Sequence, residues 1–162
     1  MPQVDLARAP VVAATVARAI AGGAVHSAHD CSEGGLLVAA AEMAFAGGLG
    51  LDLDLGAVPV VAAVQTVDTK VADTALAFGE DPSRYLLEMD ERDAQALCAE
   101  CASIGIAAAV VGCVTAAARM VVRRGAEHVM EADLDALRAA WERGALETPQ
   151  LRGDAAARGG AA

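Results

Sequence analysis

Hydrophobic and polar positions recur with two different periods along the chain, and these periods separate predicted strands from predicted helices. Residues 49–55, Leu-Gly-Leu-Asp-Leu-Asp-Leu, place leucines on one face and Asp52 and Asp54 on the other, which is typical of a half-buried strand. Residues 36–46 repeat apolar side chains at helical spacing and end at Gly47. The same patterns predict helices at 4–21, 69–77, 91–104 and after Asp133, and strands at 24–29, 84–90, 107–116 and 118–125.

The order of these elements predicts the fold class. Mixed helices and strands, with an edge hairpin expected from 107–116 and 118–125, favour an α+β fold over a doubly wound parallel sheet. We expect a layered α/β/α domain with a mixed sheet, in which the last helix turns Trp141 inward. A chain of 162 residues suits one domain, at 1–147, followed by a flexible Gly/Ala/Arg-rich tail at 148–162.

Composition and charge narrow the classes of partner. The formal net charge of −10 opposes binding to nucleic acid or to an anionic membrane surface. No apolar run approaches the ~20 residues of a membrane span. The N-terminal residues do not resemble a secretory leader, and the cysteines show no disulfide framework. We therefore expect a cytoplasmic protein with reduced thiols.

The cysteines and histidines predict no metal site and no catalytic residue. Cys98 and Cys101 form a C-x-x-C inside a helical pattern, but no second pair completes a zinc tetrad. His26 and His29 are three residues apart in a predicted strand, so they point to opposite faces. Cys31 near His29 is expected to be a buried structural thiol rather than a nucleophile.

A first candidate site is the turn between the strand at 24–29 and the helix at 36–46. Gly34 and Gly35 can turn the backbone so that amide groups face an anion at the positive end of the helix. Asp30 and Ser32 offer a carboxylate and a hydroxyl to a metal or phosphate. The alternative is a plain strand-to-helix turn in which Asp30 or Ser32 only caps the helix.

A second candidate site is the turn Gly-Glu-Asp-Pro-Ser-Arg at 79–84. Glu80 and Asp81 can bind Mg²⁺ or sugar hydroxyls, and Arg84 can hold a phosphate. The alternative is a solvated type I turn in which Pro82 fixes the backbone angle φ.

Together these turns carry a resemblance to a known family. Residues 27–55, SAHDCSEGGLLVAAAEMAFAGGLGLDLDL, and residues 76–89, LAFGEDPSRYLLEM, resemble the C-terminal, AIR-synthase-related domain of phosphoribosylformylglycinamidine synthase. The resemblance extends over about 4–146 and joins three motifs in the family's order. At the position of Asp81-Pro82 the first-half counterpart in the family carries Ser-Gln, so the turn departs from the substrate-contacting pattern.

The resemblance implies a part in de novo purine synthesis. The intact enzyme uses ATP and Mg²⁺ to convert formylglycinamide ribonucleotide and glutamine-derived ammonia into formylglycinamidine ribonucleotide. Its partners include a glutaminase subunit and a small bridging subunit. In this family the catalytic residues lie in other domains, so we expect the domain alone to be inactive. The residues that border its inter-domain nucleotide or phosphate cleft would be Asp30, Ser32, Gly34, Gly35, Glu80, Asp81 and Arg84.

Two alternatives remain open from the sequence. The chain can be a stand-alone binding or interaction module that keeps the fold without catalysis. It can also belong to another enzyme of the same superfamily, such as an aminoimidazole ribonucleotide synthase, but the F-G-E-D-x-x-R motif at 78–84 argues against that interpretation. A domain separated from its neighbours exposes an apolar face, so we expect the isolated chain to self-associate.

Overall fold

The computed structural model describes residues 5–60 and 69–147 of the chain. The predicted tail at 148–162 and most of the segment at 56–68, which has no decisive hydrophobic period, lie outside the described residues. The described helices and strands, with the 3₁₀ turn η1, are α1 (Ala9–Ala21), β1 (Val25–Asp30), α2 (Gly35–Gly47), β2 (Gly50–Asp54), η1 (Leu55–Ala57), α3 (Thr69–Phe78), β3 (Tyr85–Met89), α4 (Glu91–Ser103), β4 (Gly112–Thr115), β5 (Arg119–Arg124), β6 (Glu127–Asp133) and α5 (Leu134–Glu147).

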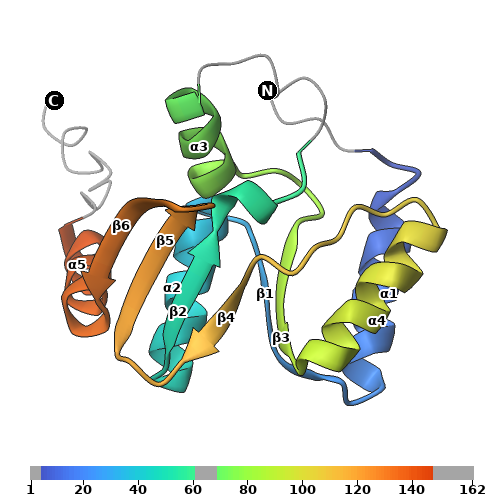
Figure 1. Ribbon diagram of the computed structural model, residues 1–162, viewed down its shortest axis with the longest axis horizontal. Helices are drawn as coiled ribbons and strands as arrows, with labels where there is room; N and C mark the ends of the chain where they lie inside the picture. Colours follow the sequence, from blue (N-terminus) through green and yellow to red (C-terminus); the bar gives the residue numbers. More distant parts are fainter. Residues whose placement is uncertain (1–4, 61–68, 148–162) are drawn as a thin grey trace, which may run out of the picture.

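The strands form two sheets, and the larger one is mixed. A four-stranded sheet has the order β4-β2-β5-β6, in which β2 runs antiparallel to β4 and parallel to β5 (Figure 1). A two-stranded antiparallel sheet joins β1 and β3 and pairs Asp30 with Tyr85. The α+β class with a mixed sheet is therefore confirmed.

The predicted hairpin between 107–116 and 118–125 is wrong, because β2 lies between β4 and β5. The connection between these two strands crosses the start of β2 at Gly50, where a Cβ atom would lie 1.8 Å from the carbonyl oxygen of Ala117. Only a residue without a side chain permits this crossing. The actual hairpin joins β5 to β6, a strand that no sequence pattern predicted, through a turn at Gly125 with φ of +58°.

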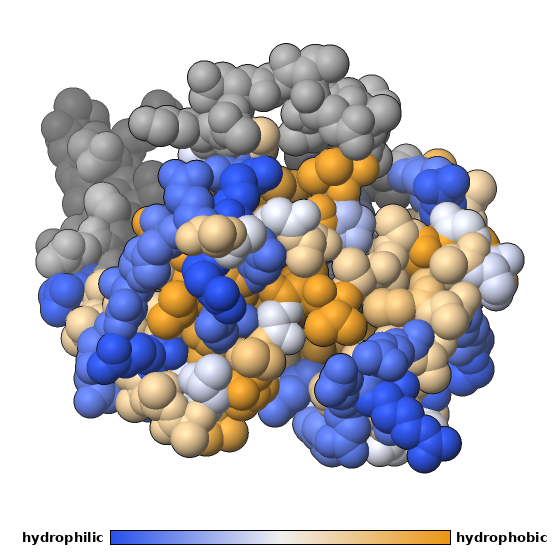
Figure 2. Space-filling model, in the orientation of Figure 1, coloured by the Kyte–Doolittle hydropathy of each residue, from blue (hydrophilic) through white to orange (hydrophobic). Residues whose placement is uncertain are grey.

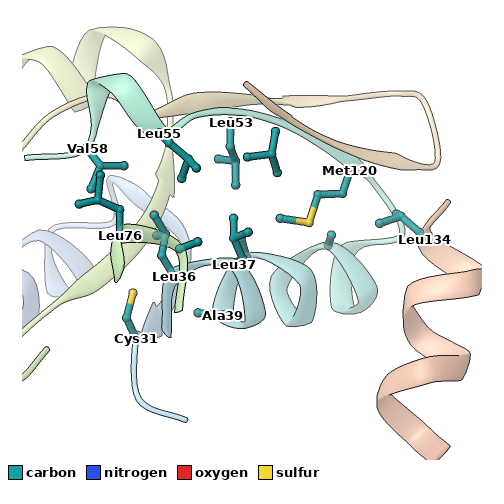
Figure 3. Packing of buried hydrophobic residues seen from close by; sticks show 14 residues of the cluster. Cys31, Leu36, Leu37, Ala39, Leu53, Leu55, Val58, Leu76, Met120 and Leu134 are labelled. Carbon is teal, nitrogen blue, oxygen red and sulfur yellow. The ribbon is translucent and has the colours of Figure 1, made fainter. Parts of the chain in front are cut away.

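The core lies between the four-stranded sheet and α2. Figure 3 shows Leu53 of β2 and Met120 of β5 directed toward Leu37 of α2. Met120 is 1% exposed and Val122 is not exposed at all. Most side chains that α2 contributes are small, so the helix packs close to the sheet while burying little area per residue.

Outside this core, two helices lie together at the other end of the molecule. Helices α1 and α4 are side by side (Figure 1), and an ion pair joins Arg18 to Glu100. At the opposite end, Leu134 of α5 is buried, but Trp141 is 50% exposed. The expected inward position of Trp141 is therefore wrong, because the first turn of α5 places Leu134 in the core, whereas the indole N–H of Trp141 donates to Oε1 of Glu42 at the surface. None of the helices that the structure describes is long and apolar enough to cross a membrane.

Candidate functional site

The turn between β1 and α2 has the backbone conformation that its two glycines allow. Gly34 and Gly35 have φ of +77° and +68°, in the left-handed region that favours glycine. A Cβ atom on Gly35 would lie 2.7 Å from the carbonyl carbon of Phe78 and 2.8 Å from the carbonyl oxygen of Gly79. The backbone of this turn therefore touches the backbone at the end of α3.

That close approach joins the two candidate sites predicted separately from the sequence. The backbone N–H of Gly34 donates to Oε1 of Glu80 over 3.0 Å. The N–H of Cys31 donates to the carbonyl oxygen of Arg84 over 2.9 Å. The turns at 30–35 and 79–84 thus form one structural unit, which we call the double turn.

The capping role considered for Asp30 and Ser32 is wrong. Gly34 occupies the N-cap position of α2, and no side chain on the N-cap residue bonds the helix. Of Asp30 and Ser32, only Ser32 bonds the first turn of α2, and it does so through its backbone carbonyl, which accepts from the N–H of Gly35 over 3.2 Å. Glu80 instead supplies a negative charge at the positive end of α2, from more than forty residues away in the sequence.

Arg84 binds the chain itself. Its Nη1 donates to the carbonyl oxygens of Leu76, over 3.1 Å, and Gly79, over 3.4 Å. These oxygens belong to the last turn of α3 and to the residue after it, where helical carbonyls lack partners and a cation is favourable. The guanidinium therefore holds the end of α3 against the double turn.

The remaining predicted residues are more open to solvent. Ser32 and Asp81 are exposed, and neither side chain makes a hydrogen bond to another residue that the structure describes. The Asp30 side chain is 64% exposed and lies 3.7 Å from Nδ1 of His29. Within the described ranges no three His, Cys, Asp or Glu side chains are placed to hold a metal ion. The double turn thus presents the polar side chains of Asp30, Ser32 and Asp81 to solvent.

Cys31 lies beneath this surface as a structural thiol. It is 3% exposed, and burial raises its pKa despite the opposing charge of Arg84. A thiol with a raised pKa is a poor nucleophile at neutral pH. The prediction that Cys31 is buried is therefore confirmed. Cys101 is also buried and Cys98 is half-buried, as expected for small apolar residues of α4.

A polar network that no sequence pattern predicted lies behind the double turn. Nε2 of His29 lies 2.8 Å from Oε2 of Glu42, and the indole N–H of Trp141 donates to Oε1 of the same carboxylate over 2.9 Å. Nδ1 of His29 lies 2.7 Å from the carbonyl oxygen of Asp30. Both ring nitrogens of His29 therefore lie within hydrogen-bond distance of an oxygen atom. The network ties β1, α2 and α5 together, and no local signal in the chain could have found it.

Comparison with known proteins identifies the family. The profile described as "AIR synthase related protein, C-terminal domain" matches residues 2–125. The phosphoribosylformylglycinamidine synthase subunit PurL of Deinococcus radiodurans is 39% identical over 143 residues, which are 88% of this chain and 18% of that protein. The corresponding subunit of Rhodospirillum rubrum is 42% identical over 111 residues, or 68% of this chain and 13% of that protein. The chain spans less than a fifth of these relatives.

Solved structures support the same fold. T. maritima PurL complexed with FGAR superposes with a TM-score of 0.75 at 20% identity, covering 85% of this chain and 22% of that one. The same protein complexed with ATP gives a TM-score of 0.69 at 21% identity, over 78% and 21% of the two chains. A structure described as PurLQS from Thermotoga maritima gives 0.67 at 19% identity, over 78% and 21%. The double turn, the mixed sheet and the extent of these matches lead to one conclusion: the chain belongs to the AIR synthase related C-terminal domain family.

Proposed function

We propose that this chain is the C-terminal domain of a phosphoribosylformylglycinamidine synthase and contributes one wall of an inter-domain cleft in that enzyme of purine synthesis. The observation that carries the proposal is the 39% identity to a PurL subunit across 88% of the chain. The contact between Gly34 and Glu80 supports it, because it brings together two of the motifs on which the resemblance depends. The chain corresponds to 18% of that relative, so the rest of the site belongs to other domains.

The proposed reaction takes place in the intact enzyme. ATP, accompanied by Mg²⁺, activates the formyl amide oxygen of formylglycinamide ribonucleotide as an iminophosphate, and ammonia from glutamine displaces the phosphate. The resemblance implies that the catalytic residues for that reaction lie in other domains of the enzyme. The domain is therefore a structural and binding element and is inactive when isolated.

Two of the predicted cleft residues, Gly34 and Arg84, form hydrogen bonds within the chain. The N–H of Gly34 is bonded to Glu80, and the Arg84 guanidinium is bonded to backbone carbonyls. The N–H of Gly34 and the Nη1 group of Arg84 are therefore already bonded within the chain in this arrangement. We assign them to shaping the cleft wall, and we assign direct contacts across the cleft to the exposed groups Asp30, Ser32 and Asp81.

The intact enzyme is expected to work with further subunits in the cytoplasm. The description PurLQS for a T. maritima structure supports a multi-subunit assembly for that relative. For the present protein we propose a glutaminase subunit, which supplies ammonia, and a small bridging subunit. Without its neighbouring domains, the isolated chain is expected to self-associate through its exposed apolar surface.

Complementation tests the proposal. The chain is added to a D. radiodurans PurL from which the matching domain has been deleted, and formylglycinamidine ribonucleotide is measured with ATP and ammonia. Restored activity is expected, and it should fall with Asp81→Asn but not with Asp135→Asn, an exposed carboxylate on α5. If the wild-type chain neither binds the deleted enzyme nor restores product formation, the proposal is wrong.

Calorimetric titration of the isolated chain with MgATP distinguishes the stand-alone alternative. The proposed role predicts no binding heat, because the chain carries only one wall of the cleft. Saturable binding by the chain alone would instead support an independent binding module.

A further inference from the structure

An apolar cleft of about 920 Å³ opens between the two sheets. Its walls are formed by α1, β3 and α4 on one side and by β2, β4 and the segment 106–111 on the other. Figure 2 shows hydrophobic residues gathered in the middle of this face, between two polar regions. The cleft is separate in composition from the polar double turn, although Arg84 contributes to its lining.

The strand edges that line this cleft are open. In the described part of the chain, β4 pairs only with β2, and β3 pairs only with β1. Residues 107–110, just before β4, form no backbone hydrogen bond with any other described residue. Val110 is 50% exposed and Val114 is 39% exposed. Unpaired backbone groups beside exposed valines are a template for an added strand.

The open edge at residues 107–115 lacks the sequence features that keep an edge strand from pairing with another chain. Residues 107–115, Ala-Ala-Ala-Val-Val-Gly-Cys-Val-Thr, contain no charge and no proline, which are the usual means of preventing strands from pairing with other chains. By contrast, β6 at the other edge of the same sheet carries Glu127, Glu131 and Asp133. The uncharged edge is therefore the one suited to be covered by a partner.

The charged side chains that line the cleft indicate the charge of the segment that binds there. Three carboxylates line it, on Glu88, Asp90 and Glu91. The basic side chains of the lining are Arg84 and His26, whose Nε2 lies 3.3 Å from Oδ1 of Asp90. Glu88 and Glu91 accept hydrogen bonds from the neutral side chains of Ser27 and Gln95, so three carboxylates face two basic groups in the lining. An acidic lining disfavours a second copy of a chain with net charge −10 and favours a basic segment.

We infer that the cleft binds an extended apolar segment with flanking lysine or arginine, which the neighbouring domain of the same synthase supplies and which adds a strand along β4. The inference rests on the proposed function, since that function requires the neighbouring domain. The segment's backbone pairs with the edge at 107–115, and its alternate side chains enter the cleft. Its basic flank lies beside the carboxylates at the end of β3 and the start of α4.

Peptide scanning tests this inference without requiring a truncated enzyme to fold. Overlapping peptides cover the part of D. radiodurans PurL outside the stretch that this chain matches, and binding of the full 162-residue chain to each is measured. The expected ligands alternate apolar residues and carry lysine or arginine at one end. If no peptide binds, or if the bound peptides are acidic, the inference is wrong.

Matched variants locate the binding surface. Val114→Glu places a carboxylate on the open edge and should weaken peptide binding by about tenfold or more, because the carboxylate would be buried without a partner. Val129→Glu, at a valine that is 45% exposed on the opposite edge strand β6, should leave binding unchanged. Glu91→Lys should weaken binding of basic peptides, whereas Glu127→Lys on β6 should not.

The outcomes separate this inference from the proposed function. If Val114→Glu and Val129→Glu bind the peptides equally well, the inference is wrong, while the proposed function still stands on the complementation test. Failed complementation with retained, edge-dependent peptide binding would overturn the proposed function instead. If Val114→Glu abolishes self-association and no peptide binds, the occupant is a second copy of the chain and the inference is wrong.

Discussion

Replacing Gly35 by alanine tests whether the two turns are held in direct backbone contact. Gly35 has φ of +68°, and a Cβ atom there would lie within 3 Å of backbone atoms of both Phe78 and Gly79. Backbone atoms in a packed turn cannot move aside as a flexible side chain can. Alanine at this position therefore meets two separate costs, one from the left-handed backbone and one from the overlap.

The two costs have different magnitudes. A non-glycine residue in the left-handed region costs about 1–2 kcal/mol. Overlap in a well-packed site adds about 1–3 kcal/mol. We therefore expect Gly35→Ala to reduce the free energy of unfolding by roughly 2–5 kcal/mol, a large part of the roughly 5–15 kcal/mol typical of a domain.

Gly48→Ala is the matched control. Gly48 has a similar φ of +65°, but a Cβ atom there would meet nothing within 4 Å. This variant should lose only the backbone cost of about 1–2 kcal/mol. Urea denaturation monitored by circular dichroism measures both variants. Equal losses for Gly35→Ala and Gly48→Ala would refute the close approach of the two turns.

Individual side chains supply three further predictions. Hydrogen bonds from the backbone N–H groups of Gly125 and Gly56 lower the pKa of the Asp54 carboxyl from 3.8, so the carboxylate stabilises the fold above pH 3.8 and this contribution is lost as pH falls through the lowered pKa. Asp54→Asn should therefore reduce the free energy of unfolding at pH 7 and make that free energy less dependent on pH in acid. An unchanged pH dependence in acid would contradict this. Glu42→Ala removes the acceptor of the indole N–H of Trp141, the only tryptophan, so its emission maximum should move to longer wavelength, and an unchanged maximum would count against the contact. Thiol alkylation of the native protein at pH 8 should modify the exposed Cys113 well before Cys31, because burial shields Cys31 and raises its pKa. If the two cysteines are alkylated at equal rates that do not change with denaturant, Cys31 is not buried.

Local patterns in the sequence determined most of the elements. The alternation in 49–55 predicted β2, and glycines at 47 and 48 marked the end of α2, because periodicity and chain stops act over a few residues. The same local signals identified Gly34 and Gly35 as a turn and revealed the family motifs in the two turns.

Tertiary structure alone decided how these elements pair. The position of β2 between β4 and β5 depends on a crossing over Gly50, which joins residues far apart in the chain. Likewise, Glu80 caps α2 in place of Asp30 or Ser32, and Trp141 bonds Glu42 on the surface instead of entering the core. Each of these contacts spans more than forty residues. The sequence therefore determined which local structures form and which turns carry the family motifs, whereas packing between distant segments decided the order of the strands and the partner of each polar group.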